Sequence, residues 1–312
     1  MKQQNDTLWK VILEHFFYDF LLLIDPDLAA TININKEITF MDKELNQQRP
    51  ADGEKFELKI VDKLVKLYTT EGNDEWILVH LEVQHQYQKN FSKRMYGYYN
   101  RLYDRYHKPI TAYAIFTEPN LIKRDNVYQT TCGRTALKYT FNTYKVALQD
   151  DDFLRNHANP FALVVLIAKQ TDLKKKYKNK KVYDQMLLDD KLSIAKLIFD
   201  RHLPDVKEKE LINFLFHYVN FEFSETQAKF EQGINLLTNK NISKMTIQQI
   251  VLGQRELIGK RKGIKIGERK AKEEVVARML EMKMLSEEQI IEMTEVTPKL
   301  VSRIRKKLEK VH

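Results

Sequence analysis

The chain has 312 residues, 43% hydrophobic and 30% charged, which is enough for one large core or two smaller ones and excludes a disordered tail or a fibrous repeat. No stretch reaches the roughly 18 uncharged apolar residues of a spanning helix, and the start lacks a signal-peptide pattern, so we expect no membrane contact and a cytoplasmic location. The single cysteine, Cys132, excludes an internal disulfide and cysteine-pair zinc sites, while a net charge of +9 favours polyanionic partners.

The first 150 residues carry signals of both helices and strands. A long apolar helix is predicted from Trp9 to the break at Asp25-Pro26-Asp27. The elements expected after it are a short strand over 32–40, a short helix around 41–45, two strands over 56–68 and 75–84 that form a hairpin, a helix over 91–106 and a strand over 110–116. This order predicts an α/β fold, with a mixed sheet flanked by helices.

The rest of the chain is expected to be helical. Residues 151–252 have apolar residues at helical spacing and form the predicted second region, after a core domain at 1–150. Over 253–269, glycines about four residues apart with lysine and arginine between them give no apolar face, and we interpret this segment as a linker. In the appendage at 270–312, a capping box at Ser286 and Gln289 and a Thr297-Pro298 pair predict helix starts, within three short helices similar to a helix-turn-helix.

In the strand over 75–84, apolar residues alternate with residues that could serve in a functional site. Odd-numbered apolar residues from 77 to 83 form one face, which places His80, Glu82 and Gln84 together on the other. A hairpin that turns near Gly72 brings Asp62 opposite Glu82. Two carboxylates in apolar strands need a cation, and hard oxygen ligands suit Mg²⁺, with Mn²⁺ as the alternative. The sequence therefore predicts a divalent metal site at Asp62 and Glu82.

This arrangement resembles the PD-(D/E)xK nuclease superfamily: an Asp on one strand, a turn, Glu-x-Gln on the next, then a basic aromatic helix and another strand. More narrowly, the segments WKVILEHFFYDFL, ITFMDKEL, VDKLVKLY, ILVHLEVQ, FSKRMYGYYNRLYDRY and NPFALVVL, over about residues 8 to 168, are similar to the bacterial Rpn, or transposase-like, nucleases. The resemblance implies a metal-dependent DNA endonuclease related to recombination or mobile elements.

The resemblance also implies roles for single residues. Asp62 matches the motif aspartate and Glu82 the metal-binding glutamate, while Gln84 stands where most of the superfamily has lysine. The helix acid is Glu44, with Glu14 as the competing choice. Glutamine lacks the positive charge that orients water and stabilises the developing phosphorane, so two interpretations stay open. Either Lys66, on the same face as Asp62, supplies that charge, or it is a solvated strand lysine and the site is weak or inactive.

Basic residues outside this site suggest where DNA would bind. Arg94, Arg101 and Arg105 form a stripe on the helix at 91–106, expected either to grip backbone phosphates or to be a solvated face. In the appendage, Arg303 and Lys306 belong to a basic helix that would bind DNA electrostatically. The alternative for this last helix is packing or homodimerisation through its apolar stripe. The alternative for the whole chain is a non-catalytic module that binds DNA or a protein partner.

Overall fold

The computed structural model describes residues 2–41, 61–70, 76–86, 88–238, 273–281, 286–294 and 298–308. They belong to two compact units, Met1–Ile242 and Ser243–His312, each of which is described by itself. The predicted short helix with Glu44 and the predicted linker at 253–269 lie outside the described residues. None of the described helices is long and apolar enough to cross a membrane.

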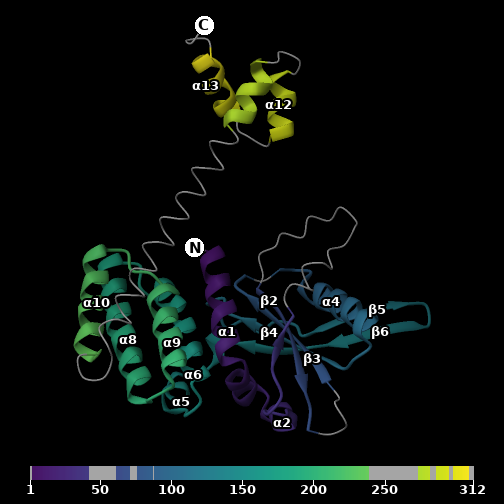
Figure 1. Cartoon of the computed structure of the whole chain (residues 1–312), viewed down its shortest axis with the longest axis vertical. Coiled ribbons are helices and arrows are strands. Elements are labelled where there is room, and N and C mark those ends of the chain that lie inside the picture. Colours follow the sequence, from purple (N-terminus) through teal and green to yellow (C-terminus); the bar gives the residue numbers. More distant parts are fainter. Residues whose placement is uncertain are drawn as a thin grey trace. The chain divides into compact units, whose positions relative to one another are not determined.

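The first unit contains a five-stranded mixed sheet in the order β1-β2-β3-β4-β7 (Figure 1). Its strands are β1 (Thr39–Phe40), β2 (Val61–Tyr68), β3 (Trp76–Gln84), β4 (Ile110–Phe116) and β7 (Asn142–Lys145). β2 and β3 pair antiparallel, while β3, β4 and β7 run parallel. The mixed α/β class, the hairpin and the strand at 110–116 are thus confirmed. Valine, isoleucine and leucine dominate the central strands because helices cover both of their faces.

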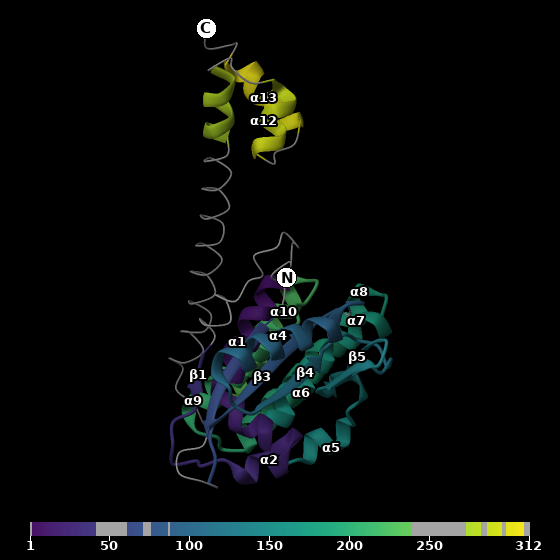
Figure 2. The ribbon, with the colours of Figure 1, turned by 90° about the vertical axis from the view of Figure 1, so that its right-hand side faces the viewer.

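Helix α1 (Lys2–Ile24) separates the sheet from the helical region and is therefore apolar on several sides (Figures 1 and 2). Phe20 contacts Tyr113 of β4 edge-on, with ring centroids 5.5 Å apart, and Phe161 of the helical region at 5.4 Å. Trp9 contacts Phe214 at 5.5 Å. α1 ends before Asp25, whose side chain caps α2 (Pro26–Thr31).

Helix α4 (Phe91–Tyr106) covers the other face of the sheet, at the position predicted for a helix. Its buried stripe of Phe91, Met95 and Leu102 meets even-numbered residues of the strands. Two clusters form this layer of the core: Phe91, Met95, Ala112, Ala114, Phe116 and Phe141, and Leu64, Leu78 and Leu102. The even-numbered face of β3, which carries the candidate site, therefore lies beneath α4.

Two parts of the predicted strand pattern need correction. Of the strand predicted over 32–40, only Thr39 and Phe40 pair with β2, and Ile32 forms one isolated bridge to Thr69. The Asn33 side chain accepts a hydrogen bond from the backbone of Asn35 and makes a turn between them. A second hairpin, β5 (Val127–Cys132) and β6 (Thr135–Thr140), was not predicted, and neither was β7. These strands are short and polar, and β5 and β6 pair only with each other.

The helical prediction for the second region is confirmed over its described part. A single 3-10 turn, η1 (Val146–Leu148), precedes this region. The elements within it are α5 (Asp151–Asn156), α6 (Phe161–Lys169), η2 (Gln170–Asp172), α7 (Leu173–Lys176), α8 (Lys180–Asp200), α9 (Asp205–His217) and α10 (Ser224–Thr238). Residues Phe161 to Ala168 of α6 are all buried, because this helix contacts α1, α8 and α9. α1 also contacts α9, so the sheet and the helical region form one unit rather than separate bodies.

The second unit has its own small core. Residues 273–281 are helical and pack with α12 (Glu287–Thr294) and α13 (Pro298–Leu308) around Val276, Ile290, Val301 and Ile304. The predicted capping box is present, because the Ser286 amide donates to Gln289 Oε1 at 2.9 Å and the Gln289 amide donates to Ser286 Oγ at 3.3 Å. The apolar stripe of α13 thus finds its packing partners within this unit.

Candidate functional site beneath helix α4

The register of the β2–β3 hairpin places two acidic positions directly opposite each other. The Cα of Asp62 pairs with the Cα of Glu82, as the sequence predicts, and Leu64 pairs with His80. Directly opposed residues of an antiparallel pair share a face of the sheet. The side chain of Asp62 lies outside the described part of the structure, so its position follows from the register alone. The side chain of Glu82 is fully buried.

Arg94 of α4 reaches down to the two functional positions of β3. Its Nη2 atom donates to Oε1 of Gln84 at 3.1 Å and lies 3.3 Å from Oε2 of Glu82. Its Nη1 atom donates to Oε1 of Gln88, just before α4 begins. The Arg94 side chain is only 8% exposed. A single guanidinium therefore orients the amide and the carboxylate of the Glu-x-Gln motif and neutralises a buried charge.

His80 contacts the same carboxylate from the other side. Its Nε2 atom lies 3.3 Å from Oε1 of Glu82, and its ring packs edge-on against Tyr98 at 5.1 Å. Both side chains of the pair are fully buried. A buried carboxylate is costly unless groups that donate hydrogen bonds or carry positive charge surround it. Here Arg94 and His80 flank Glu82, so its two oxygens both face nitrogen atoms.

The structure corrects the prediction that the three arginines of α4 form one solvent-facing stripe. Arg94 belongs to the buried face, Arg101 is half-buried with its guanidinium 5.1 Å above the Tyr98 ring, and Arg105 is exposed above Tyr106. Position 94 is three residues after Phe91, next to Met95 and four residues before position 98. This helical spacing was the signal that could have placed Arg94 against the sheet. The proposed grip of Arg101 and Arg105 on phosphates stays a prediction.

The other candidate acids and bases lie elsewhere. Lys66 is opposite Leu78, and its Nζ atom lies 4.8 Å from the ring of Tyr68. Glu14 of α1 forms an ion pair with the buried Lys63. Lys63 is opposite Leu81, on the face of the sheet away from Glu82. Arg94, and not Lys66 or Glu14, is thus the charged side chain that contacts both residues of the motif in the described structure.

In the second unit, the two residues predicted to bind DNA lie on α13. Arg303 donates to Oε1 of Glu273 at 2.6 Å and is 60% exposed. The side chain of Lys306 is outside the described residues. The ion pair ties α13 to the helix at 273–281 and leaves most of the guanidinium in contact with solvent.

The donor set at β3 suits a hard cation, although no group of three or more His, Cys, Asp or Glu side chains lies close enough to hold a metal among the residues that the structure describes. Glu82 supplies a carboxylate and Gln84 an amide oxygen from one face of one strand, and Asp62 occupies the position opposite Glu82. Carboxylate and amide oxygens are ligands that Mg²⁺ accepts. These oxygens would fit a divalent ion if Asp62 contributes the second carboxylate and Arg94, which contacts both Glu82 and Gln84, moves aside.

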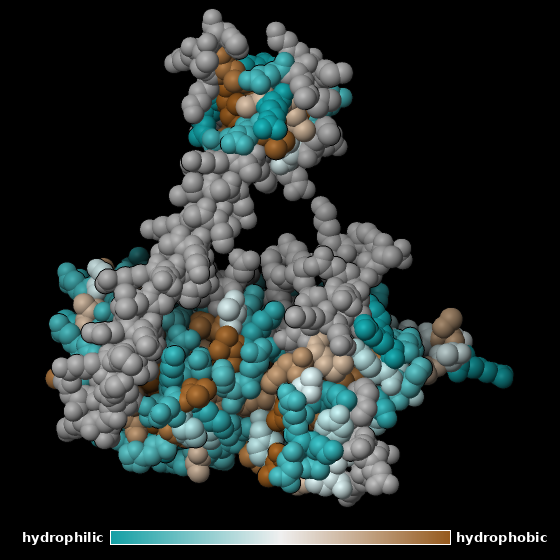
Figure 3. Space-filling model, in the orientation of Figure 1, coloured by the Kyte–Doolittle hydropathy of each residue, from teal (hydrophilic) through white to brown (hydrophobic). Residues whose placement is uncertain are grey.

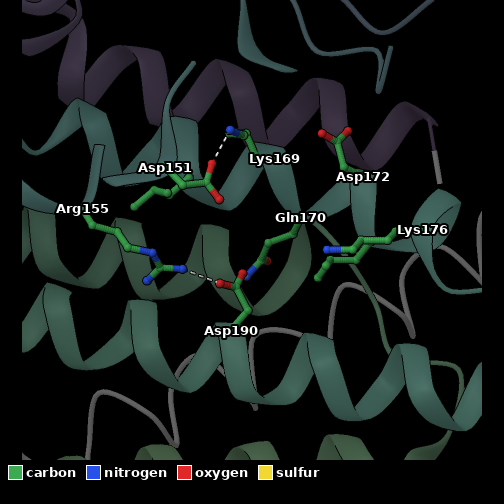
Figure 4. Close-up of a pocket in the computed structure, with 9 residues that line it drawn as sticks. Asp151, Arg155, Lys169, Gln170, Asp172, Lys176 and Asp190 are labelled. Atoms are coloured by element: carbon green, nitrogen blue, oxygen red, sulfur yellow. Dashed lines mark hydrogen bonds and ion pairs between the residues drawn. The ribbon is translucent and has the colours of Figure 1, made fainter. Parts of the chain in front are cut away.

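A separate hollow of about 250 Å³ lies in the helical region, between α5, the end of α6, α7 and α8 (Figure 4). Its charged side chains mostly neutralise one another. Asp190 accepts from Arg155 at 2.6 Å and from Gln170 at 2.9 Å, and Lys169 forms an ion pair with Asp151. These contacts join α5 and η2 to α8, and α6 to α5. We therefore interpret the hollow as a structural junction and not as the candidate site.

Comparisons with protein-family models, with curated proteins and with solved structures found no match to this chain. Membership of the Rpn family and of the PD-(D/E)xK superfamily thus remains a prediction from the motifs.

Proposed function

We propose that this protein is a metal-dependent DNA endonuclease that hydrolyses phosphodiester bonds, in the manner of transposase-like, recombination-promoting nucleases. The observation that carries the proposal is the Cα pairing of Asp62 with a fully buried Glu82 at the centre of a mixed sheet, with Gln84 on the same face. Arg94 offsets the charge of Glu82, but a second acid at the paired position is unfavourable for stability alone, which favours a functional reason for this arrangement.

We assign a separate role to each residue at this site. Asp62 and Glu82 would hold the cation, Mg²⁺ or Mn²⁺, and Gln84 would hold a water molecule through its amide. When bound, the divalent ion would lower the pKa of a water molecule, which provides the nucleophile for attack on phosphorus. Arg94 orients Glu82 and Gln84 and supplies positive charge near the position where most of the superfamily has lysine. It thereby replaces Lys66 as the proposed source of that charge.

Plasmid nicking tests the proposal. Supercoiled plasmid is incubated with the purified full chain and Mg²⁺ or Mn²⁺, and with EDTA as the metal-free control. We expect nicking that requires metal and is lost in Asp62→Asn and in Glu82→Gln. Glu225→Gln, at an exposed position on α10, is the matched control and should cleave as the unaltered protein does. Nicking that both site variants retain would show that the activity does not come from this site.

The second candidate is a binding module without catalysis, and Gln84 is the observation that favours it. Titration calorimetry with Mn²⁺ separates the two functions. A protein that binds the metal through Asp62 and Glu82, but nicks no plasmid, is the binding module. In that case Gln84→Lys should introduce cleavage, because it restores the charged side chain of the superfamily pattern.

A further inference from the structure

The hairpin of β5 and β6 is a two-stranded ribbon that projects from the first unit (Figure 1). Its six paired positions run from Val127 opposite Thr140 to Cys132 opposite Thr135. The turn contains Gly133, whose φ of +57° is one that glycine adopts without strain. At about 3.4 Å per residue, each strand extends for roughly 20 Å.

Tyrosines anchor the base of the ribbon to α4. Tyr128 stacks on Tyr96 with ring centroids 5.0 Å apart, and Tyr139 contacts Tyr99 at the same distance. Burial raises the pKa of the Tyr139 hydroxyl, in agreement with the contact of this β6 residue with α4. The ribbon is thus fixed to the same helix whose Arg94 contacts Glu82 and Gln84.

Beyond these tyrosines, both faces of the ribbon are exposed to solvent. All residues from Gln129 to Ala136 are exposed, and the outermost point of the hairpin is hydrophilic (Figure 3). Residues 127–140 include Arg134 and Lys138 but no Asp or Glu. An isolated two-stranded hairpin gains little stability from itself in water, so its length is not explained by the stability of the core.

We propose that this ribbon enters a groove of duplex DNA and positions the duplex over the site beneath α4. This inference rests on the proposed function and names its substrate as double-stranded. The major groove is wide enough for a two-stranded ribbon. Arg134 at the turn and Lys138 on one face carry the charge that matches the phosphates. Thr135 lies between them, and Gln129 lies opposite Lys138, and their side chains can donate and accept hydrogen bonds.

The base of the ribbon is connected to the candidate site through a few packed residues. Phe141 follows β6 directly and packs with Phe91 and Phe116. Phe116 lies opposite Gln84 in the register of β3 and β4. The base of the ribbon is therefore joined to the α4 side of the sheet, the side that carries the candidate site.

The first test measures binding of the full chain to a fluorescent duplex of about twenty base pairs in EDTA, so that no cleavage contributes. We expect the Arg134→Glu/Lys138→Glu variant to bind the duplex at least about ten-fold more weakly. The slope of its log affinity against log salt concentration should fall by the equivalent of roughly two phosphate contacts. Lys196→Glu/Lys229→Glu, at exposed helical positions, makes the same change in charge and should bind almost normally. Circular dichroism confirms that each variant is folded.

The second test uses the chain's only cysteine, Cys132, which is exposed near the ribbon's turn. A duplex that carries a pyridyl disulfide on a tether at one phosphate should exchange with the Cys132 thiol, which forms the cross-link and releases pyridine-2-thione, and Cys132→Ser should not react. Unchanged duplex affinity in the charge-reversal variant would overturn the proposal. Preferential cross-linking of Cys132 to RNA would also overturn it. The same holds if the charge-reversal variant loses self-association but still binds the duplex.

The two proposals fail separately. If no metal condition gives nicking but the ribbon variant still binds the duplex more weakly, the ribbon proposal is supported and the nuclease proposal is refuted. If nicking is intact and the ribbon variant binds as the unaltered protein does, only the ribbon proposal falls.

Discussion

The guanidinium of Arg94 lies 3.3 Å from the carboxylate of Glu82, and both side chains are buried. This pair is the only arginine–carboxylate contact made to the Glu-x-Gln motif by the described residues. It connects α4 to β3 through charge, in a layer that is otherwise apolar.

Arg94→Met should destabilise the first unit. The substitution leaves Glu82 buried without its cation, and removal of one partner of a buried pair typically costs about 3–5 kcal/mol of unfolding free energy. The double variant Arg94→Met/Glu82→Gln should recover much of that loss, since the uncompensated charge is gone. Urea unfolding measures both. Arg105→Met, at an exposed position on the same helix, is the control. Equal stability of Arg94→Met and the control would contradict a structural role for the pair.

Lys191 should make the stability of the first unit rise with pH. Burial lowers its pKa to about 7, while its Nζ atom donates to the carbonyl of Leu215 at 2.5 Å and faces the rings of Phe221 and Phe230. Between pH 7 and about 10.5 the unfolded chain binds the extra proton, so unfolding free energy increases through that window and is flat below it.

Urea unfolding at pH 7 and pH 9.5 measures this rise, which we expect to be on the order of 3 kcal/mol. Lys191→Met removes the titrating group and should abolish the rise, whereas Lys196→Met, exposed on the same helix, should retain it. A rise that persists in Lys191→Met would assign the titration to another group.

His217 should make the same unit sensitive to acid. Burial, and then the charge of Lys191, lower its pKa to about 4. The unfolded histidine binds its proton near pH 6.5, so the stability that the neutral folded ring contributes is lost as pH falls from 6.5 towards 4. Thermal melts over this range should show a shallower decline for His217→Gln than for the unaltered chain. His15→Gln, exposed on α1, is the control, and an identical decline in both variants would refute the assignment.

Ser286→Ala should loosen the start of α12 in the second unit. The hydroxyl accepts from the Gln289 amide, and loss of such a cap typically costs about 1 kcal/mol. Amide hydrogen exchange at Gln289 should accelerate about five-fold as a result. Ser302→Ala, exposed within α13, leaves the cap intact and should exchange normally. Unchanged protection in Ser286→Ala would mean that tertiary packing, and not the cap, holds this turn.

Much of the fold followed from local pattern. The two-residue alternation in β3 determined that His80, Glu82 and Gln84 share a face, and the position of the turn determined that Asp62 faces Glu82. Start signals such as Ser286 with Gln289 located helices in the second unit. These features depend on neighbours within a few residues, or on one hairpin, so the sequence itself contains the information.

Only the tertiary structure decided which side chains cover the face of β3 that carries His80, Glu82 and Gln84. A helical period shows which residues of α4 lie together but not which element they contact, so it could not tell whether Arg94 meets water or Glu82. In the same way, Glu14 contacts Lys63 on the far face of the sheet, and a polar hairpin projects where no strand was expected. The contacts of Arg94 and Glu14 join side chains of different elements, and the burial of the whole core, not a local preference, selects among them.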